Sequence, residues 1–253
     1  MLSAVVSDFR QRDIAAGGEG APISALADDA IFASVPRPCA ILNLGGLANL
    51  TILREAGETL SFDTGPANSL LDGLARRFLG RAFDSDGAAA ASGHAHEKLV
   101  VELLAHPFLQ QQPPKSTGRD TFGEAYVSEV IARARELCVL SNDAAAQDLL
   151  ASAADFVARS VVDSLGRFGG GVQWLVLCGG GAQHARVVDT LALYSRAPVV
   201  SSSDFGVDPD AREALVFAVL GARFILGHPV TRPSATGARA GRVLGKFSPA
   251  PIP

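Results

Sequence analysis

The chain has few of the residues that build redox, metal or nucleic-acid sites. Its 253 residues include only three cysteines, and the net charge of −4 is scattered, without a basic stripe for nucleic acid. Cys39, Cys138 and Cys178 are far apart and lack metal-ligand spacing. So sparse and odd a count suits a reducing cytosol, so we expect a cytoplasmic protein whose cysteines pack as small apolar side chains.

Long hydrophobic runs are also missing. No apolar stretch is long enough to cross a membrane, and the first residues lack the basic region of a signal peptide. The short run 1–6 predicts a strand already under way at residue 1, from which we expect a segment upstream. With 48% hydrophobic residues, the chain can still bury the core of one large or two small domains.

Apolar runs and helical periodicity predict the order of the elements. Runs at 39–44, 50–53 and 60–62 predict an antiparallel meander of three strands. Helices are expected from about residue 68, over 97–104, and near 122–137 and 144–168. A β-α-β-α series then follows at 174–178, 185–193, 198–200 and 210–226. Residues 87–93 are expected to form a linker, and the tail from residue 229 a loop.

This order predicts an α/β fold, a ribonuclease-H-like (actin-like ATPase) domain with a mixed sheet and helices on both faces. That fold is the half-unit of the sugar kinase, Hsp70 and actin superfamily. We expect residues 39–253 to form one such lobe, with a helical insertion at about 85–143.

One carboxylate and two glycine clusters indicate chemistry. Asp63 follows an apolar run and precedes a helical pattern, and Gly45-Gly46 and Gly179–Gly181 each follow a predicted strand. Glycines after strands let backbone N–H groups approach phosphate, so the set suggests phosphoryl transfer with a general base. The alternatives are that Asp63 caps the next helix and that Gly45-Gly46 is an ordinary hairpin turn.

Nine segments in order resemble the bacterial anhydro-N-acetylmuramic acid kinases. They include Asp8-Phe9-Arg10-Gln11-Arg12-Asp13 and Phe62-Asp63-Thr64-Gly65-Pro66-Ala67-Asn68. The others are residues 17–22, 42–50, 84–87, 114–119, 178–182, 213–218 and 234–238. The family opens with a phosphate loop that has no counterpart here, so the resemblance implies that the N-terminal lobe is mostly missing and that residues 1–38 are its remnant and connecting loop.

The resemblance implies an ATP-dependent kinase of peptidoglycan recycling. Members use ATP and water to open 1,6-anhydro-N-acetylmuramic acid and phosphorylate O6, giving N-acetylmuramic acid 6-phosphate and ADP. We therefore expect ATP, Mg²⁺ carried by ATP, an amino-sugar substrate and a homodimer, with neither nucleic acid nor membrane as a partner. The alternative is a truncated, inactive fragment that keeps sugar-binding or dimerisation surfaces; a weaker one is another sugar kinase.

The resemblance also implies roles for individual residues. Asp63 matches the base that activates water for attack at C1. The sugar is expected to contact Glu213 and either Arg12 or its neighbour Arg10. The expected nucleotide-binding residues are Asn43, Gly45, Gly46 and Asn49 around the phosphates and Gly179, Gly180 and Gly181 at the adenosine. No metal ligand is expected, since a turn suits Asp86 and an exposed loop suits His94 and His96 better. Lys115-Ser116-Thr117 lacks the spacing of a P-loop, so we expect it to order a loop near the cleft.

Overall fold

A five-stranded mixed sheet is the centre of the molecule. The computed structural model describes residues 4–55, 59–140 and 145–250. The strands are β2 (Cys39–Leu44), β3 (Leu47–Leu53), β4 (Thr59–Pro66), β5 (Trp174–Cys178) and β6 (Val199–Ser201), and their spatial order is β4-β3-β2-β5-β6. The first three are antiparallel, β5 is parallel to β2, and β6 is parallel to β5. This is the predicted ribonuclease-H-like topology, and the fold class is confirmed.

Alternating side chains of the strands enter two separate cores, because successive residues of a strand face opposite sides. In β2, Ala40 and Leu42 join the larger core, while Cys39 and Ile41 join the smaller one. Helices α3 (Asn68–Phe78) and α9 (Ala145–Phe168) cover the face of the sheet that carries the larger core. Helix α2 (Ala25–Ile31) lies on the opposite face. The sheet thus has helices on both faces, as predicted.

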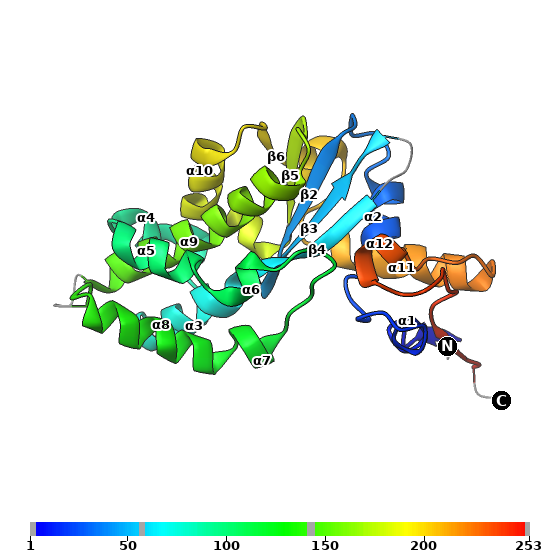
Figure 1. The fold of residues 1–253 in the computed structure, drawn as a ribbon, viewed down its shortest axis with the longest axis horizontal. Coiled ribbons are helices and arrows are strands. Elements are labelled where there is room, and N and C mark those ends of the chain that lie inside the picture. The colour runs from blue at the N-terminus through cyan, green and yellow to red at the C-terminus, as the bar shows by residue number, and fades with distance from the viewer. Residues whose placement is uncertain (1–3, 56–58, 141–144, 251–253) are drawn as a thin grey trace.

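A helical group extends the larger core away from the sheet (Figure 1). It contains α4 (Ala88–Ser92), α5 (Glu97–Leu104), α6 (Pro107–Gln110), α7 (Arg119–Phe122) and α8 (Glu124–Glu136). The prediction of a linker at 87–93 was wrong, because α4 occupies most of it. Asp84 accepts hydrogen bonds from the backbone of Ala89 and Ala90 at 2.9 Å each, which satisfies free donors of this short helix.

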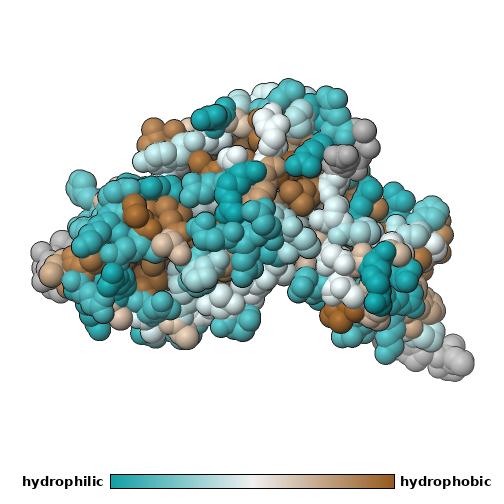
Figure 2. Space-filling model, in the orientation of Figure 1, coloured by the Kyte–Doolittle hydropathy of each residue, from teal (hydrophilic) through white to brown (hydrophobic). Residues whose placement is uncertain are grey.

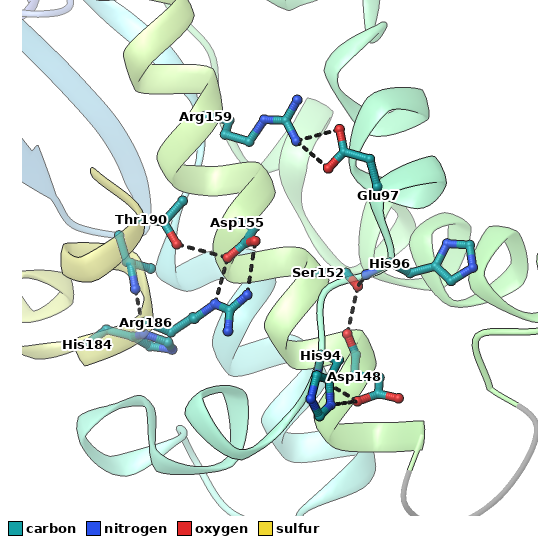
Figure 3. Close-up of polar contacts among 11 residues, drawn as sticks. His94, His96, Glu97, Asp148, Ser152, Asp155, Arg159, His184, Arg186 and Thr190 are labelled. Carbon is teal, nitrogen blue, oxygen red and sulfur yellow. Dashed lines mark hydrogen bonds and ion pairs between the residues drawn. The ribbon is translucent and has the colours of Figure 1, made fainter. Parts of the chain in front are cut away.

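Polar side chains of α9 join the helices around it (Figure 3). Asp155 binds Arg186 of α10 (Ala185–Tyr194) at 2.7 and 3.0 Å, and Arg159 reaches Glu97 of α5. The backbone N–H groups of His94 and His96 donate to Asp148 and Ser152 of the same helix. The segment that carries both histidines is thereby held on α9.

The ends of the described chain meet on the other side of the sheet (Figure 1). Strand β1 (Val5–Ser7) pairs antiparallel with β7 (Lys246–Ser248) and contacts α11 (Arg212–Ile225). Helices α1 (Gln11–Ala15) and α12 (Pro233–Thr236) lie on the same side of the molecule, and α12 contacts β4. The prediction that the tail from residue 229 is a loop was therefore wrong in part, because it contains α12 and β7. Strand β7 has only three residues and is exposed along its length, so it is too short for a periodic pattern in the sequence to indicate it.

Some predictions fall outside the described residues: the start of the first strand at 1–3, the start of the long helix at 144 and the end of the insertion at 143. In the part that is described, no helix is both long and apolar enough to cross a membrane. The surface in Figure 2 mixes hydrophilic and hydrophobic side chains, and its lower outline is hollowed between the helical group and the side that carries α1.

Candidate active site

A cavity of about 400 Å³ lies beside Asp63. Segments far apart in the sequence form its wall: the loop at 21–24, the β2–β3 hairpin, β4, the loop before α7 and the first turns of α11. Asp63 is 7% exposed, and its side chain shares a face of the sheet with Thr51 and Ser61. The carboxylate is thus nearly buried yet reaches a space that can hold a ligand.

Asp63 lies inside an edge strand and not at a strand's end. Strand β4 continues to Pro66, and Asp63 pairs with Asn49 of β3 next to a shift in register. Asn49 Nδ2 donates to Oδ1 at 3.0 Å, and the backbone N–H of Thr117 and the Ser116 hydroxyl donate to Oδ2 at 2.9 and 3.2 Å. Neutral donors therefore fix both carboxylate oxygens.

Burial raises the pKa of Asp63, because a charged carboxylate loses solvation inside the protein. The hydrogen bonds from Asn49, Thr117 and Ser116 and the charge of Arg10 oppose this rise without cancelling it. The alternative role as a helix cap was wrong. Helix α3 begins after Ala67, and the carbonyl groups of Gly45 and Gly46 accept hydrogen bonds from its first N–H groups.

The predicted sugar-binding residues divide into two places. Arg10 and Glu213 line the cavity with Asp63. Arg12 does not line it: its guanidinium donates to Val243 O at 3.1 Å and lies 5.7 Å from the ring centre of Phe224. Arg10, the arginine that lines the cavity, is held by a hydrogen bond from its guanidinium to the backbone oxygen of Gly20 at 2.7 Å.

The predicted nucleotide residues divide in the same way. Asn43, Gly45, Gly46 and Asn49 line the cavity of Asp63, while Gly180 and Gly181 line a second cavity of about 460 Å³. Asn68, at the start of α3, lines this second cavity and its neighbour Ser69 lines the first. The start of α3 thus contributes neighbouring residues to the two cavities.

Gly179 lines neither cavity, and its geometry gives it a packing role. Its φ is +80°, and a Cβ on it would lie 2.8 Å from Leu44 O. Only glycine suits so close an approach at this dihedral angle. This accords with a close contact between segments, the alternative weighed from the sequence, and the role of Gly179 in nucleotide binding stays a prediction.

Two charged residues of the cavity wall, Arg119 and Arg212, were not among the site residues predicted from the sequence, and Arg212 is the buried one. Arg212 is 5% exposed and donates from Nε and Nη2 to Asp28 at 2.9 and 2.6 Å. Thr51 Oγ1 donates to the same carboxylate at 2.9 Å. No short motif joins residues 184 positions apart, so only the folded chain reveals this pair.

The described residues contain no dedicated metal site. Among residues 4–55, 59–140 and 145–250, no group of three or more His, Cys, Asp and Glu side chains could hold an ion. Asp86, considered for Mg²⁺, lines the second cavity from the left-handed dihedral region, with φ of 55°. Its place in a turn accords with the alternative preferred from the sequence.

The fold and the buried carboxylate together define a ribonuclease-H-like domain of the actin superfamily with a candidate general base. The family model for anhydro-N-acetylmuramic acid kinase matches residues 3–250, so the chain belongs to that family. It is 41% identical over 247 residues to the anhydro-N-acetylmuramic acid kinase of Pseudomonas putida, covering 97% of this chain and 66% of that protein. The Streptomyces coelicolor kinase is 42% identical over 248 residues, covering 97% and 61%.

The chain thus spans slightly less than two thirds of the length of these relatives. Solved structures are less similar. The activator of 2-hydroxyisocaproyl-CoA dehydratase from Clostridium difficile with bound ADPNP is 16% identical, with a TM-score of 0.48 and coverage of 81% of this chain and 67% of that one. The fold assignment therefore depends on the observed strand order.

Proposed function

We propose that the chain is the base-bearing lobe of an ATP-dependent kinase for 1,6-anhydro-N-acetylmuramic acid, acting in peptidoglycan recycling in the cytoplasm. The observation that carries the proposal is Asp63, a buried carboxylate held by neutral donors at a ligand-sized cavity. Membership of the kinase family supports the choice of substrate. Residues 39–253 would form this lobe, and residues 1–38 would be the remnant of the other lobe and the connecting loop, whose helix α2 packs on the sheet. The working protein would be a homodimer.

In the proposed reaction, Asp63 takes a proton from water as the water oxygen attacks C1 of the sugar. The bond between C1 and O6 breaks, and O6 forms a bond to the γ-phosphorus of ATP. The bond between that phosphorus and the oxygen bridging to the β-phosphate breaks, and ADP leaves. The raised pKa of Asp63 suits a base, because proton affinity nearer the working pH strengthens general base catalysis. Mg²⁺ would arrive with the phosphates of ATP and offset their charge, and no residue is assigned to it.

The other cavity residues would bind and orient the two substrates. Arg10 and Glu213 would hold the sugar beside Asp63, and the β2–β3 hairpin would face the phosphates. Gly180 and Gly181 would contact the adenosine from the second cavity. Asn68 and Ser69 are neighbours and line one cavity each, which accords with a nucleotide that extends from one cavity to the other.

The test is turnover of the purified chain with ATP and the anhydro sugar in ¹⁸O-labelled water. We expect ADP, a sugar 6-phosphate and the label at C1. Asp63→Asn should lower turnover by about 10²–10⁴-fold, the usual contribution of a positioned base. The matched control is Asp163→Asn, which neutralises an exposed carboxylate of α9. Label at any other position, or an Asp63→Asn variant within a few-fold of the parent, would contradict the proposal, and absence of ADP would support the inactive-fragment alternative.

A further inference from the structure

The loop between α6 and α7 gives Asp63 two of its hydrogen-bond donors. This loop follows edge strand β4, where Lys115 O accepts a hydrogen bond from the backbone N–H of Asp63 at 3.2 Å. Ser116 and Thr117, the next two residues, donate to Asp63 Oδ2. The electrostatic environment of the candidate base therefore depends on how firmly this loop is held.

Lys115 anchors the loop from inside the protein. It is 4% exposed, and its Nζ donates to the carbonyl oxygens of Phe108 and Leu109 in α6 at 3.2 and 3.3 Å. The ammonium also lies 4.6 Å from the ring centre of Phe108. Burying a charge is costly unless it is well paired, so an apolar side chain would fill the same space at lower cost. What the lysine adds is a polar attachment of the loop to α6.

We propose that Lys115 is a positioning residue for Asp63. By fixing its loop on the carbonyl groups of α6, it holds Ser116 and Thr117 as donors to the carboxylate and thereby sets the pH at which Asp63 becomes a base. The functional meaning rests on the proposed role of Asp63 in catalysis. The geometric claim concerns only the loop and the carboxylate.

Other charged groups face these two side chains and must be separated from the effect. Arg10 acts on Asp63 through its charge, and the remaining charged residues of the cavity wall are Arg119, Arg212 and Glu213. Burial and the charge of Arg167 lower the pKa of Lys115 to about 8, although the charge of Asp63 opposes this fall, so the two side chains also interact directly through charge. Because Lys115 stays protonated below that pH, the attachment persists through the acidic range in which a carboxylate titrates.

The experiment is an NMR titration of the whole chain carrying ¹³C-labelled aspartate, with Asp63→Asn to assign the signal of Asp63. Lys115→Met fills the same volume without the attachment. We expect the pKa of Asp63 to rise by roughly one unit, because losing a hydrogen bond to the charged carboxylate changes the pKa by about that amount. Ser116→Ala should raise the pKa by less. The double variant that combines Lys115→Met with Ser116→Ala should show the same pKa of Asp63 as Lys115→Met alone, because the loop is then already displaced.

A matched control is Arg167→Met. Arg167 donates to the carbonyl oxygens of Leu109 and Gln110 at 2.8 and 2.9 Å, so it binds the same end of α6 without holding the loop. We expect this variant to leave the pKa of Asp63 unchanged. If Lys115→Met does not fold, Lys115→Gln takes its place and should give a shift of the same sign.

An unchanged pKa of Asp63 in the Lys115 variant would overturn the inference. So would additive shifts in the double variant, because they would show that the lysine acts through its charge and not through the loop. The titration needs neither ATP nor sugar, so a chain without kinase activity would contradict the proposed function and leave this result standing.

Discussion

Two buried carboxylates, Asp28 on α2 and Asp63 on β4, are both bound by side chains of β3 and have opposite surroundings. On β3, Asn49 binds Asp63, and Thr51, two residues further along the same face, binds Asp28. Asp28 is fully buried and forms two hydrogen bonds with the guanidinium of Arg212. Asp63 has only neutral donors in direct contact.

The difference teaches what makes a buried carboxylate available for chemistry. A guanidinium in direct contact satisfies the charge of Asp28 and ties α2 to the first turn of α11, so this carboxylate is structural. Asp63 keeps its place through neutral hydrogen bonds, and burial raises its pKa. Two carboxylates bound from one face of β3 thus become one half of an ion pair and a candidate base.

The largest expected effect on stability is at the paired carboxylate. Asp28→Asn leaves the guanidinium of Arg212 buried without its counter-charge, and we expect a loss of about 3–5 kcal/mol in the free energy of unfolding. Denaturant titration measures it. The double variant Asp28→Leu with Arg212→Met should recover most of the loss, because a buried ion pair can be replaced by apolar groups. A loss below about 1 kcal/mol would remove the distinction between the two carboxylates.

A smaller, pH-dependent effect is expected at Asp63. Because the folded-state pKa is raised, the unfolded chain ionises this carboxyl more readily, and the folded state loses stability as the pH rises from about 4 through the folded pKa. Asp63→Asn removes this dependence, so the parent should become less stable relative to the variant over that range. Unfolding free energies at several pH values measure it, and a difference that is flat or grows in favour of the parent would contradict the raised pKa.

How far the sequence predicts these features depends on where their information lies. Strand β5 and helix α5 were predicted with their observed bounds, because continuous apolar runs and helical periodicity are local patterns. Helix α4 was missed, since its alanines and flanking glycines resemble a linker and its stability comes from Asp84 and from packing on α9. Local patterns therefore gave the sheet and most helices but not the elements that tertiary contacts stabilise.

The candidate site shows the same limit. Asp63 and the glycines stand out because each follows a predicted strand. The donors Ser116 and Thr117 are 53 and 54 positions from Asp63, and Arg212 is 184 positions from Asp28. No local residue pattern encodes contacts between positions so far apart in the sequence. The sequence identified the group that would react, and the structure identified what holds it.

The smallest expected effect is at an exposed ion pair, which sharpens the comparison from the other side. Arg159 donates to both carboxylate oxygens of Glu97, at 2.8 and 2.7 Å (Figure 3). These distances are similar to those between Arg212 and Asp28. The side chain of Glu97, however, is 69% exposed. Water already solvates this carboxylate, so Glu97→Gln should cost only about 0–1 kcal/mol by denaturant titration.

If Glu97→Gln destabilises the chain as much as Asp28→Asn does, contact geometry and not burial would decide the strength of these pairs. Repeating both titrations at high salt separates the two explanations. Salt screens the exposed pair and leaves the buried one almost untouched, so only the loss at Glu97 should shrink. That result would identify burial as the property that makes Asp28 structural and raises the pKa of Asp63, since both carboxylates lie where salt and water have little access.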